Sequence, residues 1–218
     1  VTKNRSKAMQ LYKIAADKGN AVAQCAMGIA YEKGSDLPHN RDKSFKYLLL
    51  AANKGNGQAQ YELGNYYHDD YEHNRVLICN RTKEYEYFKV SAENGFTPAL
   101  ESLGQCYKLG IGTKENVHKA FDCFKQAADK GYPYSMFECF MCMKTGTGTK
   151  VDIQGAWNYL NKSVANGNIF AKHFLALAYL EGQEVKQNFD MAFKLFKEAA
   201  NDGCFFLICI WVFAMRKD

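Results

Sequence analysis

Glycine recurs along this chain at a nearly constant interval. Successive members of the series are separated by 36, 40, 36, 36 and 36 residues, and they are Gly19, Gly55, Gly95, Gly131, Gly167 and Gly203. Self-similarity at this period is typical of a repeat protein, in which each unit buries its apolar face only against its neighbours. The pattern therefore predicts about six similar units rather than one closed core.

A helix is predicted before each of these repeat glycines. Fifteen residues upstream of each glycine stands an asparagine or aspartate, namely Asn4, Asn40, Asn80, Asn116, Asp152 and Asn188. The side chain of such a residue accepts a hydrogen bond from an uncapped helix N–H, so we expect an N-cap at all six positions. Apolar residues at helical spacing follow, and the glycine fits the left-handed residue that ends the helix. We call this element helix B.

A second helix, helix A, is predicted after each repeat glycine. In the best-matching unit its characteristic residues are Ala99, Leu103, Gly104, Tyr107 and the closing Gly110. The pattern is weakest after Gly131, where Phe140 and Met143 replace the glycine and the tyrosine. The 40-residue unit places its four extra residues in a turn around positions 69 to 81, where a surface loop lengthens at little cost. We therefore expect an all-α fold, an α/α superhelical solenoid of about six 36-residue helix-turn-helix repeats.

Three local motifs resemble a known repeat family. They are the Leu-Gly-x-x-Tyr of helix A (Leu103-Gly104 with Tyr107), the Gly-x-Gly turn at Gly110 and Gly112, and the Ala-Ala-x-x-Gly ending of helix B. Together they resemble the Sel-one-like repeat, a relative of the tetratricopeptide repeat. The resemblance implies a right-handed superhelix that binds other proteins, as scaffolds and adaptors do. We expect this solenoid over residues 1–203 and a degenerate apolar helix over 204–218.

Hydrolysis is the alternative function, because some members of a cysteine-paired subfamily of these repeats have been labelled β-lactamases. The sequence contains no Ser-x-x-Lys, Gly-x-Ser-x-Gly or His-Glu-x-x-His motif and no phosphate-binding loop. We therefore expect a non-catalytic protein without a cofactor.

The eight cysteines do not recur as a pair from repeat to repeat, so no regular disulfide framework is predicted. Cys139 and Cys142 have the C-x-x-C spacing, but they fall in the middle of a predicted helix without a second pair at zinc-finger distance. His68, His73 and Cys79 in the long turn match no metal-binding spacing. We expect buried thiols and no metal site.

Charge and hydropathy limit the classes of partner. The net charge of +5, from 28 basic and 23 acidic residues, does not imply a nucleic-acid partner. The twelve apolar residues 204–215 are fewer than the about 20 that a bilayer-spanning helix needs. No leader follows Val1, which suggests a chain cut from a longer protein, and a cytoplasmic location is favoured.

The apolar C-terminal segment departs from the helix A pattern. We expect one of its faces to cover the last hairpin and the other to remain an exposed apolar surface that is prone to association. Self-association, another partner, and a native chain that continues differently all stay open.

The register also predicts a binding groove. In tetratricopeptide-like stacks the A helices line the concave side, and the correspondence places groove residues 3, 6, 10 and 13 positions after each repeat glycine. In the first complete unit these are Val22, Cys25, Ile29 and Glu32. In the next two units the groove positions turn polar, and in the last two they are mostly apolar and aromatic. The predicted partner-binding residues lie in these last two units and are Tyr134, Phe137, Met141, Phe170, His173 and Leu177. Either they form a patch for a protein or peptide, or they pack on one another in a tight groove.

Overall fold

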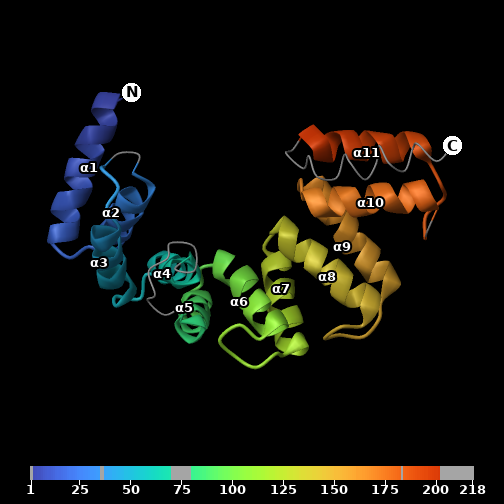
Figure 1. Ribbon diagram of the computed structural model, residues 1–218, viewed down its shortest axis with the longest axis horizontal. Helices are drawn as coiled ribbons and strands as arrows, with labels where there is room; N and C mark the ends of the chain where they lie inside the picture. Colours follow the sequence, from blue (N-terminus) through green and yellow to red (C-terminus); the bar gives the residue numbers. More distant parts are fainter. Residues whose placement is uncertain (1, 35–36, 70–79, 183, 202–218) are drawn as a thin grey trace. The chain divides into compact units, whose positions relative to one another are not determined.

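The computed structural model describes residues 2–34, 37–69, 80–182 and 184–201. Within these ranges the chain forms eleven α-helices and no strand (Figure 1), which confirms the predicted all-α helical-repeat fold. The B helices are α1 (Thr2–Asp17), α3 (Arg41–Ala52), α5 (Arg81–Glu93), α7 (Val117–Asp129), α9 (Ile153–Ala165) and α11 (Phe189–Asn201). The A helices are α2 (Ala21–Lys33), α4 (Gly57–Asp69), α6 (Pro98–Leu109), α8 (Pro133–Thr145) and α10 (Ile169–Glu181).

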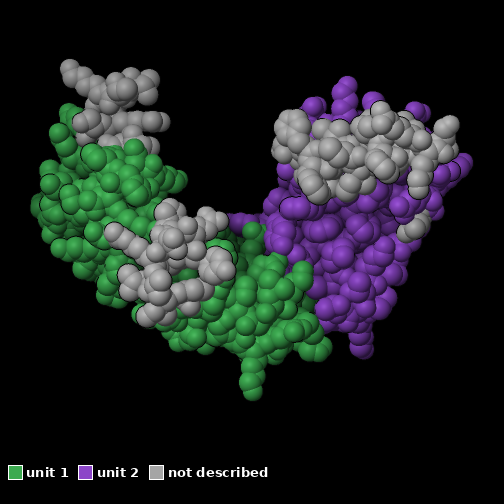
Figure 2. Space-filling view, viewed as in Figure 1, with its two compact units in different colours: residues 1–123 green, residues 124–218 purple. Residues whose placement is uncertain are grey.

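The chain divides into two compact units, residues 1–123 and 124–218 (Figure 2). In the first unit, α2 packs mainly on α3, and α4 packs mainly on α5. In the second unit, α8 packs on α9, and α10 packs on α11. Each of these A helices therefore pairs with the B helix that follows it, and the apolar faces that meet form the core.

Five of the predicted N-caps are confirmed by hydrogen bonds from a backbone N–H to the side-chain oxygen three residues earlier. The acceptors are Asn40, Asn80, Asn116, Asp152 and Asn188, at 2.8 to 3.0 Å. The prediction at Asn4 is wrong, because α1 begins at Thr2 and Asn4 lies inside the helix. A residue with helical backbone on both sides leaves no free helix end at that position to cap.

The A helices carry a second set of caps that the sequence analysis did not identify. Asn20, Asn56 and Asn168 directly follow repeat glycines, and their side chains accept hydrogen bonds from Ala23, Ala59 and Ala171 at 2.8 to 2.9 Å. In the other two units, α6 and α8 begin with Pro98 and Pro133. Proline has no N–H to satisfy and its fixed φ suits the first helical position, so it starts a helix by a different route.

The repeat glycines end the B helices as predicted. Gly19, Gly55, Gly95, Gly131 and Gly167 have φ between 79° and 94°, a conformation that glycine adopts at little cost. Gly203, the predicted apolar helix 204–218 and the inserted residues 70–79 lie outside the described residues.

The glycine inside helix A, nine residues after the repeat glycine, permits close packing of the A and B helices. A Cβ on Gly28 would lie 2.7 Å from Leu48 Cγ, and one on Gly64 would lie 2.5 Å from Phe88 Cε1. The irregular unit has Phe140 at this position, and its side chain is fully buried. Phe140 belongs to the core of the second unit, together with Leu160 and Leu175. The repeat that matches the pattern least well is therefore well packed at this position, with Phe140 in place of the glycine.

Candidate functional site

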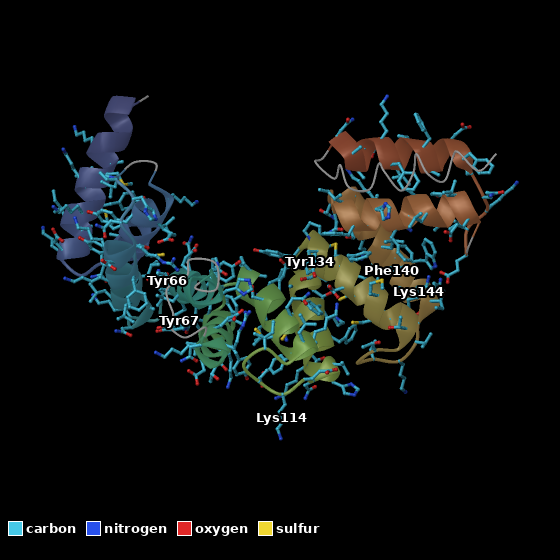
Figure 3. All side chains as sticks on the ribbon, viewed as in Figure 1. Tyr66, Tyr67, Lys114, Tyr134, Phe140 and Lys144 are labelled. Carbon is cyan, nitrogen blue, oxygen red and sulfur yellow. The ribbon has the colours of Figure 1, made fainter. Side chains whose placement is uncertain are left out.

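The six predicted partner-binding residues lie on the two A helices of the second unit. Tyr134, Phe137 and Met141 are on α8, and Phe170, His173 and Leu177 are on α10. The spacing of three and four residues within each set places its members on one face of the helix. Figure 3 labels Tyr134 near the beginning of α8, with Phe140 and Lys144 further along the same helix.

The structure brings three of the six residues into direct ring contact. The rings of Phe137 and Phe170 are stacked, with centroids 6.4 Å apart and planes 26° apart. Tyr134 meets Phe170 edge-on at 6.5 Å. These three rings therefore join α8 to α10 across one face of the unit.

The other three predicted residues are placed differently. Met141 and Leu177 are half-buried and pack against the core of the second unit. His173 is half-buried, and its ring lies 5.5 Å from the ring of Phe196 on α11. It is thus directed toward the B helix and does not share the ring contacts of Tyr134, Phe137 and Phe170.

Exposure distinguishes Phe170 from its neighbours. Its side chain is 56% exposed, whereas Tyr134 and Phe137 are half-buried. The rings thus pack on one another, and that of Phe170 remains open to solvent. We call Tyr134, Phe137, Phe170 and Phe174 the aromatic face.

Phe174 was missed by the sequence analysis. Its ring lies 4.8 Å from that of Phe140 and 6.4 Å from that of Phe137. The signal was its register, seven residues after Gly167, where the other units have Ala26, Glu62, Ser102 and Glu138. At this position the last described A helix therefore has an aromatic ring where the other A helices have a small or polar side chain.

Polar groups beside the aromatic face are also buried. The hydroxyl of Tyr134 donates a hydrogen bond to Glu138 Oε1 at 2.7 Å, and Glu138 is buried. The Nδ1 atom of His173 is buried and has no hydrogen-bond partner among the described residues. Burial lowers the pKa of His173, because desolvation disfavours the charged imidazolium.

The cysteines of the C-x-x-C sequence are both buried in α8. Burial raises the pKa of Cys139 to about 12, with a smaller contribution from Cys142. A thiol with such a pKa is protonated at neutral pH and is a poor nucleophile or metal ligand. No group of three His, Cys, Asp or Glu side chains suited to a metal ion occurs in the described part of the chain.

One predicted groove position of the first complete repeat is buried, whereas Val22 of the same set is 66% exposed. Cys25 is only 2% exposed, so its assignment to the solvent-facing groove is wrong. It packs with Leu48 and Leu63 in the core, and burial raises its pKa to about 11. The register failed here because a small side chain six residues after the glycine is covered by the neighbouring helices.

A further polar cluster joins the end of α4 to the beginning of α5. His68 Nδ1 lies 2.9 Å from Glu84 Oε1, and Arg81 donates to Glu84 Oε2 at 2.8 Å. Glu84 is buried, so these contacts compensate the desolvation of its carboxylate. His73 and Cys79, the other residues of the long turn considered for a metal, lie outside the described residues.

A hollow lies among helices α3, α4 and α5 of the first unit. Its volume is about 280 Å³, and it is lined by Ala52, Asn53, Gln60, Lys83, Glu86, Tyr87 and Val90. Five of these seven residues carry polar or charged side chains, unlike the residues of the aromatic face. Across the described ranges, no helix has the length and apolar character needed to cross a membrane.

Comparison with known proteins places the chain in a family. The profile of the Sel1 repeat matches residues 1–20, 21–56, 57–72, 97–132, 133–168 and 169–204. No curated protein matches the sequence significantly.

Solved structures share the fold. A Sel1 repeat protein from Oxalobacter formigenes is 26% identical, with a TM-score of 0.77 over 89% of this chain and 76% of that one. The protective antigen c5321 of uropathogenic Escherichia coli strains, described as displaying an SLR fold, is 23% identical, with a TM-score of 0.76 over 91% of this chain. This chain covers only 42% of that antigen's chain. A putative Sel1 repeat protein from Klebsiella pneumoniae is 15% identical, with a TM-score of 0.55 over 89% of this chain and 93% of that one.

These findings confirm the resemblance that the sequence motifs indicated. Sel1 repeat proteins are commonly protein-interaction scaffolds, and the fold is typically non-catalytic. The repeat profile covers most of the sequence, and the chain belongs to the Sel1 repeat family.

Proposed function

We propose that this protein is a non-catalytic scaffold that binds a protein or peptide partner on the aromatic face of α8 and α10. The observation that carries the proposal is the stacked pair of Phe137 and Phe170, because the pair joins two A helices while Phe170 keeps 56% exposure. Aromatic residues, phenylalanine among them, are enriched in the cores of protein–protein interfaces.

The neighbouring residues support the same function. Tyr134 adds a hydroxyl that is held by Glu138, and Met141 and Leu177 extend the apolar surface along both helices. A face of this kind suits an apolar side chain or the apolar side of a short helix, with polar groups at its margin. The partner is therefore expected to present aliphatic or aromatic anchors.

Site-specific photo-crosslinking tests where the partner lies. Peptides that bind the full chain are selected from a displayed library, and a benzophenone amino acid then replaces Phe170. The matched control replaces Phe189 on the B helix α11, which is 61% exposed. Crosslinks from position 170 and none from position 189 would support the proposal. Crosslinks only from position 189 would place the binding surface on the B helices.

A further inference from the structure

Glu184 has an unusual backbone conformation. It is the one non-glycine residue with positive φ among the described residues, at 61°. It stands seventeen residues after Gly167, and the equivalent positions of two earlier units hold Gly112 and Gly148 with φ of 65° and 74°. An L-residue in this region is disfavoured, and such outliers persist where the surroundings hold them. The last described turn thus holds a charged residue where glycine fits best.

The carboxylate of Glu184 is bound at both oxygens. The indole N–H of Trp157 on α9 donates a hydrogen bond to Oε2 at 2.8 Å. The ammonium of Lys144 on α8 lies 3.2 Å from Oε1. Lys144 Nζ also lies 4.9 Å from the ring centroid of Phe174, which orients the ammonium over the aromatic face. An indole N–H and an ammonium therefore form a two-point cradle for a carboxylate.

A small cavity adjoins this cradle. Its volume is about 100 Å³, and it is lined by Lys144, Trp157, Phe174, Leu177, Ala178 and Glu181. Ligand sites for drug-sized molecules are usually about 300 Å³ or larger, so this cavity suits a single side chain. The two groups that hold Glu184 also line the cavity, which brings a carboxylate site and an apolar recess together.

We propose that Lys144 and Trp157 bind the C-terminal carboxylate of a peptide partner, whose last, aliphatic side chain enters the cavity. A chain terminus fits because its carboxylate and its side chain are attached to the same α-carbon, as the short distance between cradle and recess requires. In the free protein, the side-chain carboxylate of Glu184 occupies the cradle, where the terminal carboxylate of the peptide would bind. The inference rests on the proposed function, since it defines one end of the peptide that the aromatic face binds.

The exchange of carboxylates follows from the contacts. An incoming carboxylate makes the same charge-assisted hydrogen bonds that Glu184 makes. The displaced Glu184 then leaves its unfavourable φ and is solvated. Glu181 also lines the cavity, and its carboxylate offers an acceptor for the backbone N–H of the terminal residue. It also repels a second anion, so the site selects one carboxylate beside an apolar group.

Peptide binding to the full chain tests the proposal. The probes are acetylated peptides that end in Ala-Leu, one with a free carboxylate and one with a C-terminal amide, and Trp157 fluorescence is followed in a Trp211→Phe background. In Glu184→Gly the cradle is vacant, so the acid peptide should bind about tenfold more tightly than in the parent chain. Glu184→Gln keeps the side chain and removes its charge, and it should also bind the acid peptide more tightly.

Two further variants identify the cradle. Lys144→Met combined with Glu184→Gly should lose the gain for the acid peptide. Lys119→Met is the matched control, because Lys119 lies over the ring of Tyr107 at 5.3 Å in the other unit. That control should leave acid-peptide affinity unchanged. A peptide with an internal Leu-Asp and an amide end tests an acidic side chain as the carboxylate source, and it should bind weakly.

The contrary outcomes separate this inference from the proposed function. Equal affinity for acid and amide peptides in Glu184→Gly, or an unchanged gain in the Lys144→Met double variant, would overturn the carboxylate site. Tight binding of the internal Leu-Asp peptide would overturn the choice of a chain terminus. If peptides bind without regard to their carboxylate but lose affinity in Phe137→Ala, the aromatic face remains the binding site and only the cradle is rejected.

Discussion

The end of the Met143 side chain, together with the carboxylate of Asp152, occupies the space that a side chain on Gly155 would need, because a Cβ there would lie 2.6 Å from Met143 Cε and still closer to Asp152 Oδ2. In three other repeats the same two positions hold a tyrosine and a lysine. The lysine Nζ lies 5.3 to 5.4 Å from the tyrosine ring centroid in the pairs Tyr31 with Lys43, Tyr67 with Lys83, and Tyr107 with Lys119. The irregular repeat has thus exchanged a cation–π pair for a thioether that fills the space of the missing side chain.

A double-mutant cycle tests that exchange. Gly155→Lys alone should destabilise the fold, because its Cβ meets both Met143 and the carboxylate of Asp152. Combined with Met143→Tyr it should recover the cation–π contact, with a favourable coupling of about 0.5–1 kcal/mol. Urea unfolding of the four proteins gives the coupling, and an additive cycle would show that the two positions do not interact.

Phe140 is expected to stabilise the second unit strongly. Its side chain is fully buried among Trp157, Phe174 and the core, so Phe140→Ala should lower the free energy of unfolding by about 3–5 kcal/mol. Urea denaturation measures the loss. A change below about 1 kcal/mol would contradict the assignment of this residue to the core.

Gly64→Ala is the complementary change in a regular repeat. The added methyl group meets the ring of Phe88, so overpacking should cost about 1–3 kcal/mol despite the better helix propensity of alanine. If Gly64→Ala stabilises the protein, helix propensity outweighs the close packing of α4 on α5.

The sequence predicted the helices and most of their ends, because the periodic apolar pattern and the capping side chains act within one turn. Asn4 failed as a cap because nothing local stops α1 from extending upstream to Thr2. The caps at Asn20, Asn56 and Asn168 were overlooked, although the asparagine that follows each of these glycines was visible in the repeat register.

The site was predictable only in part. The register predicted that Tyr134, Phe137 and Phe170 share one face of α8 and α10, and their rings do contact one another. It did not show that His173 contacts Phe196 on the next B helix, because that choice depends on side-chain packing between helices. The contacts of Glu184 with Trp157 and Lys144 join residues 27 and 40 positions apart, respectively, and no local pattern encodes them.

The buried thiols predict a loss of stability at high pH. Burial raises the pKa of Cys139 from 9.0 to about 12, so the folded state retains a proton that the unfolded chain loses. This contribution is fully present below pH 9.0 and is lost as the pH rises toward 12. Denaturant unfolding from pH 8 to 11 should therefore show a flatter pH dependence for Cys139→Ala than for the parent chain. Parallel pH profiles would contradict the raised pKa.

Self-association through the apolar C-terminal segment stays a prediction from the sequence. Residues 205–218 lie outside the described residues and contain Phe205, Phe206, Ile208, Ile210 and Trp211. Deleting them should reduce any concentration-dependent increase in mass seen by light scattering. A full chain that is already monomeric at high concentration would show that the segment drives no association.

The central claim is that the aromatic face of α8 and α10 binds the partner. The most direct measurement is the affinity of Phe137→Ala with Phe170→Ala for a peptide selected on the full chain, by isothermal titration calorimetry. Cooperative thermal melting verifies that the variant is folded, and Phe189→Ala on α11 serves as the exposed control. The account predicts a loss of about 2 kcal/mol or more for the double variant and no loss for the control. Unchanged affinity in a folded double variant would contradict the account and place the binding site elsewhere on the protein.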